Sequence, residues 1–172
     1  MAIKGAGITT KLNYDSRLNT RIQAIMELLQ TWIGFKSVEK YHRPPPWENN
    51  LPTPFCYVQP RGWRPEKTST GKYDYYGNVI IYLYASGNDP ARVGEDVMAL
   101  VAMVDKLFSD NAEGDLMGGS ASHHFLSYVP NWIESELGEA TMTEAWPIEL
   151  QSGTLWVAGA RFPFKFHDVL TP

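Results

Sequence analysis

The sequence predicts an α+β domain in which a mixed or antiparallel β-sheet is packed by two main helices, at about residues 16–33 and 90–109. Three observations lead to this class. Two segments repeat apolar residues at helical spacing, the segment Tyr73 to Ala85 is long and aromatic, and the last third of the chain alternates apolar and polar residues. The 172 residues suffice for a single domain, 1–172, with a substantial core.

The first helix is expected to run from about Ser16 to Ile33. Asp15 or Ser16 can accept a hydrogen bond from the first free N–H groups, and Gly34 lies where a left-handed C-cap belongs. The residues that make one apolar face at helical spacing are Leu18, Ile22, Ile25, Met26, Leu29, Trp32 and Ile33. Residues 1–14, which are small, polar and glycine-containing, are expected to form a flexible arm.

The second helix has a clear start. Asp89 is a favourable N-cap residue, and Pro90 occupies the first helical position, where its missing donor costs nothing. The stripe predicted to be buried contains Val93, Val97, Leu100, Val101, Val104, Leu107 and Phe108. Burial of these side chains in a hydrophobic core accounts for the whole stripe, so the stripe is evidence about the fold and not about a cofactor site.

The strand from Tyr73 to Ala85 is expected inside the sheet, because residues 79–84 are apolar on both faces. Gly77 interrupts this strand and suggests a bulge. A short strand is expected over Phe55–Val58, ended by Pro60.

The C-terminal third predicts two further strands joined by a turn. Glu139 to Leu150 contains Pro147 and is therefore expected to be an edge or bulged strand. Thr154 to His167 alternates cleanly, with one apolar face. Pro163 in this second strand also favours an edge position or a bulge.

Three long loops are predicted, at residues 35–54, 61–72 and 109–124. The first is rich in proline, and the third in Gly, Ser and Asp. The composition of 61–72 predicts a hairpin tip or a flexible loop, with an excess of basic residues and an exposed Trp63. Either it is an ordinary solvated loop or it contacts a partner. In the second interpretation, the assembly contacts are Arg61, Trp63, Arg64 and Lys67.

Bulk composition narrows the function classes. The net charge of −4 is too small to argue for a nucleic-acid or membrane partner, and no apolar run approaches the ~20 residues of a membrane span. The N-terminus lacks the apolar stretch of a signal peptide, and a single cysteine, Cys56, allows no internal disulfide, so synthesis in a reducing cytoplasm is expected. Aromatic residues make up 13% of the chain, which suits either a partner interface or an aromatic core.

No set of residues predicts chemistry. His123 and His124 are adjacent in a loop and lack the spaced partners of a zinc site. Cys56 lies in an apolar segment and is expected to be a buried structural thiol. We therefore expect no catalytic residue, no cofactor and no metal, and no enzyme activity.

The order of elements resembles that of the tail terminator (tail completion) proteins of long-tailed bacteriophages. Four segments carry the resemblance: Arg21 to Leu29, the strand Asn78 to Tyr84, the helix Glu95 to Phe108 and the strand Gly159 to Phe166. It covers most of the chain but is one of pattern, without a signature motif.

The resemblance implies a structural virion protein of the tail and neck. Such subunits form a hexameric ring on the tail tube protein, end tube polymerisation, and meet the head–tail connector protein. Neither a membrane nor sequence-specific nucleic acid is implied as a partner. The alternatives are a neck or head-completion protein of the same virion and a non-viral intracellular binding module.

Overall fold

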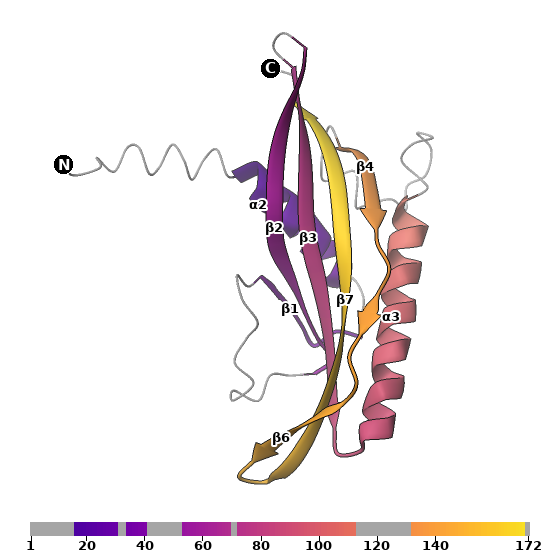
Figure 1. Cartoon of the computed structure of the whole chain (residues 1–172). Coiled ribbons are helices and arrows are strands. Elements are labelled where there is room, and N and C mark those ends of the chain that lie inside the picture. The colour runs from indigo at the N-terminus through magenta and orange to yellow at the C-terminus, as the bar shows by residue number, and fades with distance from the viewer. Residues whose placement is uncertain (1–15, 31–33, 41–52, 70–71, 113–131, 171–172) are drawn as a thin grey trace, which may run out of the picture.

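The computed structural model describes residues 16–30, 34–40, 53–69, 72–112 and 132–170 (Figure 1). In chain order the elements are α2 (Ser16–Gln30), β1 (Ser37–Lys40), β2 (Phe55–Ser69), β3 (Lys72–Gly87), α3 (Pro90–Ala112), β4 (Trp132–Leu137), β5 (Thr141–Met142), β6 (Trp146–Leu150) and β7 (Gly153–Leu170). The described strands form one seven-stranded sheet in the order β1-β2-β3-β7-β4, and β5 and β6 also pair with β7.

Both parallel and antiparallel pairs occur in this sheet. β1 runs parallel to β2, whereas β2–β3, β3–β7 and the pairs of β7 with β4, β5 and β6 are antiparallel. The long strands β2, β3 and β7 stand side by side, and β4 to β6 follow one another along the far edge of β7 (Figure 1). The predicted α+β class, a mixed sheet packed by two helices, is confirmed.

The hydrophobic core lies between one face of the sheet and the two described helices. In the regular, described parts of the three long strands, every second residue points into it, as the period of a strand requires. The strand side chains of this core are Val38, Cys56, Val58, Val79, Ile81, Leu83, Ala85, Ala158, Ala160, Phe162, Phe164 and Phe166. Both helices contribute to the same cluster, so they cover the same face.

The predicted helix faces are largely confirmed. In α2 the buried residues are Ile22, Ile25, Met26, Leu28 and Leu29, while Trp32 and Ile33 lie outside the described residues. In α3 the buried residues are Val93, Val97, Leu100, Val104 and Phe108, and Val101 and Leu107 pack against them. Burial of each large aliphatic side chain stabilises the fold by roughly 1.5–3 kcal/mol before entropy.

The start of α3 is capped as the sequence predicts. The Ala91 N–H donates to Asp89 Oδ1 at 2.9 Å, and the Val93 N–H donates to the Asp89 carbonyl at 3.0 Å. The side chain therefore satisfies one of the four N–H groups that a helix leaves unpaired at its start.

Replacing Asp89 with alanine is expected to lower the free energy of unfolding by about 1 kcal/mol, because the cap is lost. Urea unfolding followed by circular dichroism measures this. Asp105→Ala, an exposed change in the middle of the same helix, is the control and should have a smaller effect. Equal effects of the two variants would contradict the capping role.

The predicted end of β2 at Pro60 is wrong, and of the two alternatives for 61–72 the structure shows the hairpin rather than the flexible loop. β2 continues to Ser69 and β3 begins at Lys72, so most of this segment is a paired hairpin. The proline is tolerated because β1 pairs only with Phe55–Val58, and a bulge lies between Pro60 and Gly62. Beyond Val58, β2 is an edge strand among the described residues, and edges accept proline.

The predicted edge position of the last strand is also wrong, because β7 lies between β3 and β4. Its proline is accommodated by a break in the neighbouring strand. The Pro163 carbonyl accepts a hydrogen bond from the Gly138 N–H at 2.7 Å, and a strand residue directs its nitrogen and carbonyl to the same side. Pro163 therefore directs its missing donor toward residues 138–140, between β4 and β5.

The other predicted loops and strands are corrected in part. The 35–54 loop contains β1, and α3 continues to Ala112, three residues beyond the predicted end. The strand expected over Glu139 to Leu150 is two short strands, β5 and β6. The arm at 1–14, residues 41–52 and residues 113–124 lie outside the described residues.

Candidate interaction surface

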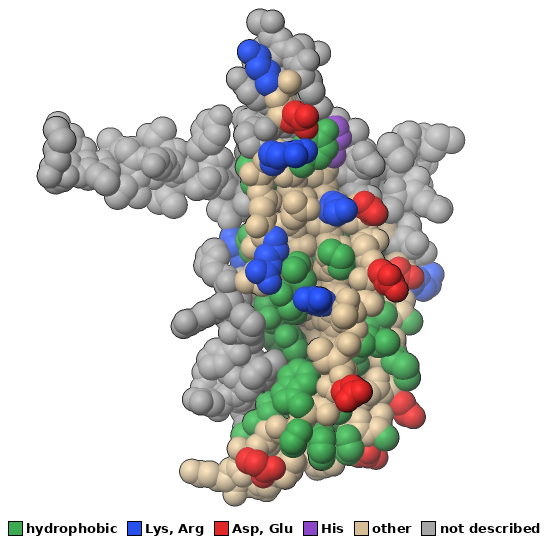
Figure 2. Space-filling model, in the orientation of Figure 1, with side chains coloured by type: hydrophobic (Ala, Val, Ile, Leu, Met, Phe, Trp, Pro, Cys, Tyr) green, Lys and Arg blue, Asp and Glu red, His purple; other side chains and the backbone are tan. Residues whose placement is uncertain are grey.

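The face of the sheet opposite the helices carries the side chains that alternate with the core. Among the residues that the structure describes, no helix packs on this face (Figure 2). We call it the outer face, and it contains Arg61, Arg64, Tyr76, Ile80, Tyr82, Tyr84, Trp146, Arg161, Lys165 and His167. Green and blue side chains lie over the middle of the sheet in Figure 2.

An aromatic cluster forms one part of the outer face. The Tyr57 ring stacks on the Tyr82 ring, with centroids 4.6 Å apart, and on the Tyr84 ring at 5.9 Å. Trp146 meets Tyr84 edge-on at 6.3 Å. Tyr57 is fully buried, whereas Tyr82, Tyr84 and Trp146 are half-buried. The half-buried rings present broad apolar area, which protein interfaces favour.

Gly159 makes room for this cluster. A Cβ atom at this position would lie 2.6 Å from Tyr84 Cε1 and 2.9 Å from the Leu83 carbonyl oxygen. Tyr84 can therefore lie flat across β7 only because residue 159 has no side chain.

Cations and rings alternate on the rest of the outer face. The Arg64 guanidinium lies 5.4 Å from the centroid of the Tyr76 ring, and that ring stacks on His167 at 4.5 Å. Arg61 Nη2 donates a hydrogen bond to the Tyr82 hydroxyl at 2.9 Å. Arg64 also pairs with Glu66 at 3.4 Å. The two arginines are thus positioned over the sheet by neighbouring side chains.

The four predicted contact residues are not brought together on one surface. Arg61 and Arg64 are exposed on the outer face. Trp63 lies on the helix side, partly buried, with its ring 5.7 Å from that of Phe166. Lys67 is exposed near the end of β2. The expectation of an exposed Trp63 is therefore wrong, because strand alternation directs it away from its two arginine neighbours.

Sequence reasoning missed the tyrosines of the outer face. Tyr82 and Tyr84 are two residues apart on β3, and this spacing places them on one face of a strand. The signal was present, but the same run is equally consistent with a strand covered on both faces.

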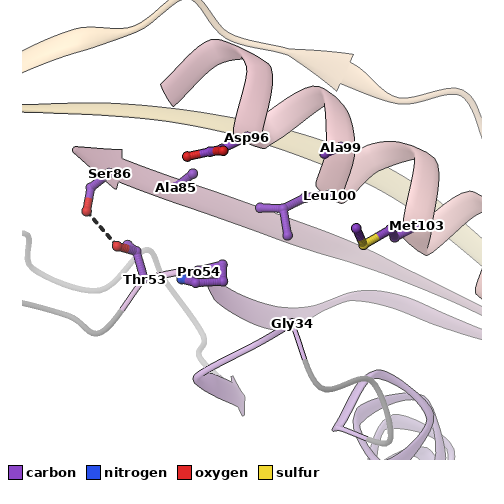
Figure 3. A pocket seen from close by; sticks show the side chains of 9 residues that line it. All are labelled: Gly34, Thr53, Pro54, Ala85, Ser86, Asp96, Ala99, Leu100 and Met103. Atoms are coloured by element: carbon purple, nitrogen blue, oxygen red, sulfur yellow. Dashed lines mark hydrogen bonds between the residues drawn. The ribbon is translucent and has the colours of Figure 1, made fainter. Parts of the chain in front are cut away.

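An open groove of about 390 Å³ lies beside α3 on the other side of the sheet (Figure 3). It is lined by Gly34, Thr53, Pro54, Ala85, Ser86, Asp96, Ala99, Leu100 and Met103. The hydroxyls of Thr53 and Ser86 are 2.6 Å apart and hydrogen-bonded to each other. Asp96 is the one charged residue among these lining residues, so no set of polar groups converges here.

Cys56 lies in the core, fully buried, which confirms its interpretation as a structural thiol. Burial raises the pKa of the Cys56 thiol far above its ordinary value, so the thiol stays protonated in the fold. Burial likewise raises the pKa of Tyr57 and of Tyr84. None of the three is poised to ionise near neutral pH.

These shifts predict a loss of stability in alkali. The folded protein keeps the Cys56 proton, whereas the unfolded chain releases it as the pH rises above the ordinary pKa of 9.0. The contribution is complete below that pH and is lost above it, at about 1.4 kcal/mol per pH unit. Tyr57 adds a second loss above its ordinary pKa of 10.0.

Urea unfolding at several pH values between about 8 and 10 measures the slope. In Cys56→Ala the free energy of unfolding should be lower overall but should depend less on pH in this range. An unchanged slope would contradict the assignment to the Cys56 thiol.

The described residues contain no group of three or more His, Cys, Asp or Glu residues placed to hold a metal ion. His123 and His124 lie outside them. None of the helices in the described ranges is long and apolar enough to span a membrane.

Comparison with known proteins adds no assignment. No protein-family model matches the chain, and no curated protein matches it in sequence.

Proposed function

We propose that this chain is a structural virion protein, a tail terminator that assembles into a hexameric ring on the end of a phage tail tube. The ring ends polymerisation of the tube and provides the surface that the head–tail connector meets. In this role the chain works by contact alone, without a catalytic residue, cofactor or metal.

The observation that carries the proposal is the outer face of the sheet. Half-buried Tyr82, Tyr84 and Trp146 lie beside exposed Arg61 and Arg161 on a rigid set of long strands. Tyrosine, tryptophan and arginine are the residues most enriched at protein interfaces. The α+β arrangement and the order of its elements support the same proposal through the resemblance to tail terminators.

The test is to grow tail tubes from the tube protein of the genome that encodes this chain, with and without the purified chain. Electron microscopy should show a ring at one end of the tubes and a shorter, narrower length distribution. Unchanged tube lengths with no added density would contradict the proposal. Density at the capsid vertex alone would instead identify a neck or head-completion protein, and a genome without virion genes would favour a non-viral binding module.

A further inference from the structure

The two edges of the sheet carry opposite charge. On one side, β1, β2 and the residue preceding β1 contain Lys36, Lys40, Arg61, Arg64 and Lys67, against two acidic residues, Glu39 and Glu66. We call these five residues the basic edge. On the other side, residues 132–150 contain no Lys or Arg and five glutamates, Glu134, Glu136, Glu139, Glu144 and Glu149, which we call the acidic edge.

The separation is visible on the outer face. Most blue side chains in Figure 2 lie over the left and middle of the sheet, and most red ones lie to the right. The five basic side chains are exposed, as are Glu136, Glu139, Glu144 and Glu149. The sheet is therefore positively charged at one edge and negatively charged at the other, although the net charge of the whole chain is only −4.

The strand register places β4 of the acidic edge at the height of Arg61 and Arg64 in β2. Glu134 is level with His167 of β7, which is level with Tyr76 of β3 and with Arg64 of β2. By the same steps Glu136 is level with Gly62, which adjoins Arg61. A second copy moved sideways by the width of the sheet would thus bring β4 of one copy opposite β2 of the next.

The direction of the strands also fits. β2, β3, β7 and β4 are antiparallel in succession, so β4 of one copy would run antiparallel to β2 of its neighbour. Pro60, Pro65 and the bulge at Arg61 interrupt the free edge of β2 and oppose a continuous backbone ladder. The contact must therefore depend mainly on side chains, with Arg61 of one copy at the height of Glu136 of the next.

We infer that the basic edge of one copy of this chain binds the acidic edge of a second copy, head to tail. Such a heterologous contact closes into a ring when the rotations of successive subunits add up to one full turn, and the twist of the sheet supplies a rotation between neighbours. This inference rests on the proposed ring-forming function and identifies the surfaces that build the ring.

Charge reversal with mixing tests the inference on the full chain. Arg61→Glu with Arg64→Glu makes β2 acidic like β4, and Glu134→Lys with Glu136→Lys makes β4 basic like β2. Each double variant alone should lose self-association by about 100-fold, because like charges then face each other. An equimolar mixture of the two should recover it in even-numbered assemblies, measured by native mass spectrometry and analytical ultracentrifugation.

Matched controls keep the same change in net charge away from the edges. They are Arg92→Glu with Lys106→Glu, and Glu95→Lys with Asp105→Lys, all at exposed positions of α3. Both should associate like the wild type, and circular dichroism checks that every variant is folded. Independently of any variant, association of the wild type should weaken about tenfold or more when salt is raised to about 0.5 M.

Three outcomes would overturn the inference: a wild-type chain that stays monomeric at low salt, charge-reversed variants that associate normally, or a mixture of folded variants that does not associate. The proposed function fails separately. If the ring assembles by these edges but does not shorten tail tubes, the inference stands and the terminator role is wrong. If the chain caps tail tubes but the charge-reversed variants assemble normally, the terminator role stands and the inference about the edges is wrong.

Discussion

Replacing Phe164 with alanine is expected to lower the free energy of unfolding by about 3–5 kcal/mol. The Phe164 side chain is only 1% exposed and lies on β7, beneath α3. Its ring centroid is 5.2 Å from that of Phe108 and 6.3 Å from that of Phe166. The substitution removes apolar contacts and leaves a cavity where the helix meets the centre of the sheet.

Urea unfolding monitored by circular dichroism and by tryptophan fluorescence measures this loss. The matched control is Lys165→Ala, the next residue of the same strand, whose side chain is exposed on the outer face. That change should alter the free energy of unfolding by no more than about 0.5 kcal/mol. If both variants lost a similar free energy of unfolding, the loss would come from any substitution in β7 rather than from removal of a core side chain, which would contradict this explanation.

Replacing Gly77 with alanine is expected to lower the free energy of unfolding by about 2–3 kcal/mol. A methyl group at this position would overlap the ring of Phe166, which pairs with Gly77 across the β3–β7 ladder. That ring is 2% exposed and lies between Trp63 and Phe164, so it has little room to move. Alanine would gain about 0.4–1 kcal/mol from reduced freedom of the unfolded chain, which is smaller than the clash.

Two comparisons separate the overlap with the Phe166 ring from the general effect of replacing glycine with alanine. Gly94→Ala in α3 has no atom within 4 Å of the added Cβ and should raise the free energy of unfolding by about 0.5–1 kcal/mol. Gly77→Ala should also cost less in a Phe166→Leu background than in the wild type, because the smaller side chain leaves space. Strictly additive effects of the two substitutions would contradict this explanation.

The helices could be predicted from the sequence almost completely. Their apolar residues recur at helical spacing, and Asp89 followed by Pro90 marks a start that local chemistry alone decides. The glycine in β3 shows the limit of such reasoning. Gly77 suggests a bulge, but the two bulges of this strand pair lie in β2, at Arg61 and Thr68, and Gly77 is required by the ring of Phe166 that covers it.

Two of the strand errors share one cause: whether a strand tolerates proline depends on the strand beside it. Pro60 lies beyond the end of β1, and Pro163 faces the break between β4 and β5. Among the described residues, neither position has a neighbouring strand that needs the missing donor, and this depends on residues far away in the chain. Local sequence therefore suggests that β2 ends at Pro60 and allows an edge position for β7, and both expectations are wrong.

The candidate surface was predicted in part. The excess of basic residues at 61–72 directed attention to Arg61 and Arg64, which do lie on the outer face. In a loop, Trp63 could lie on the same side as its arginine neighbours. In a strand, successive side chains point to opposite faces, so Trp63 points away from them. The opposite charge of β4 is informative only together with the register, which places this strand at the height of Arg61 and Arg64 in β2.

The mass of the purified chain in solution tests the central claim, that this protein acts by assembling with copies of itself. Native mass spectrometry at low ionic strength should show a species of six times the 19.4 kDa subunit mass, which dissociates as salt is added. A single species of 19.4 kDa at every protein and salt concentration would contradict the account.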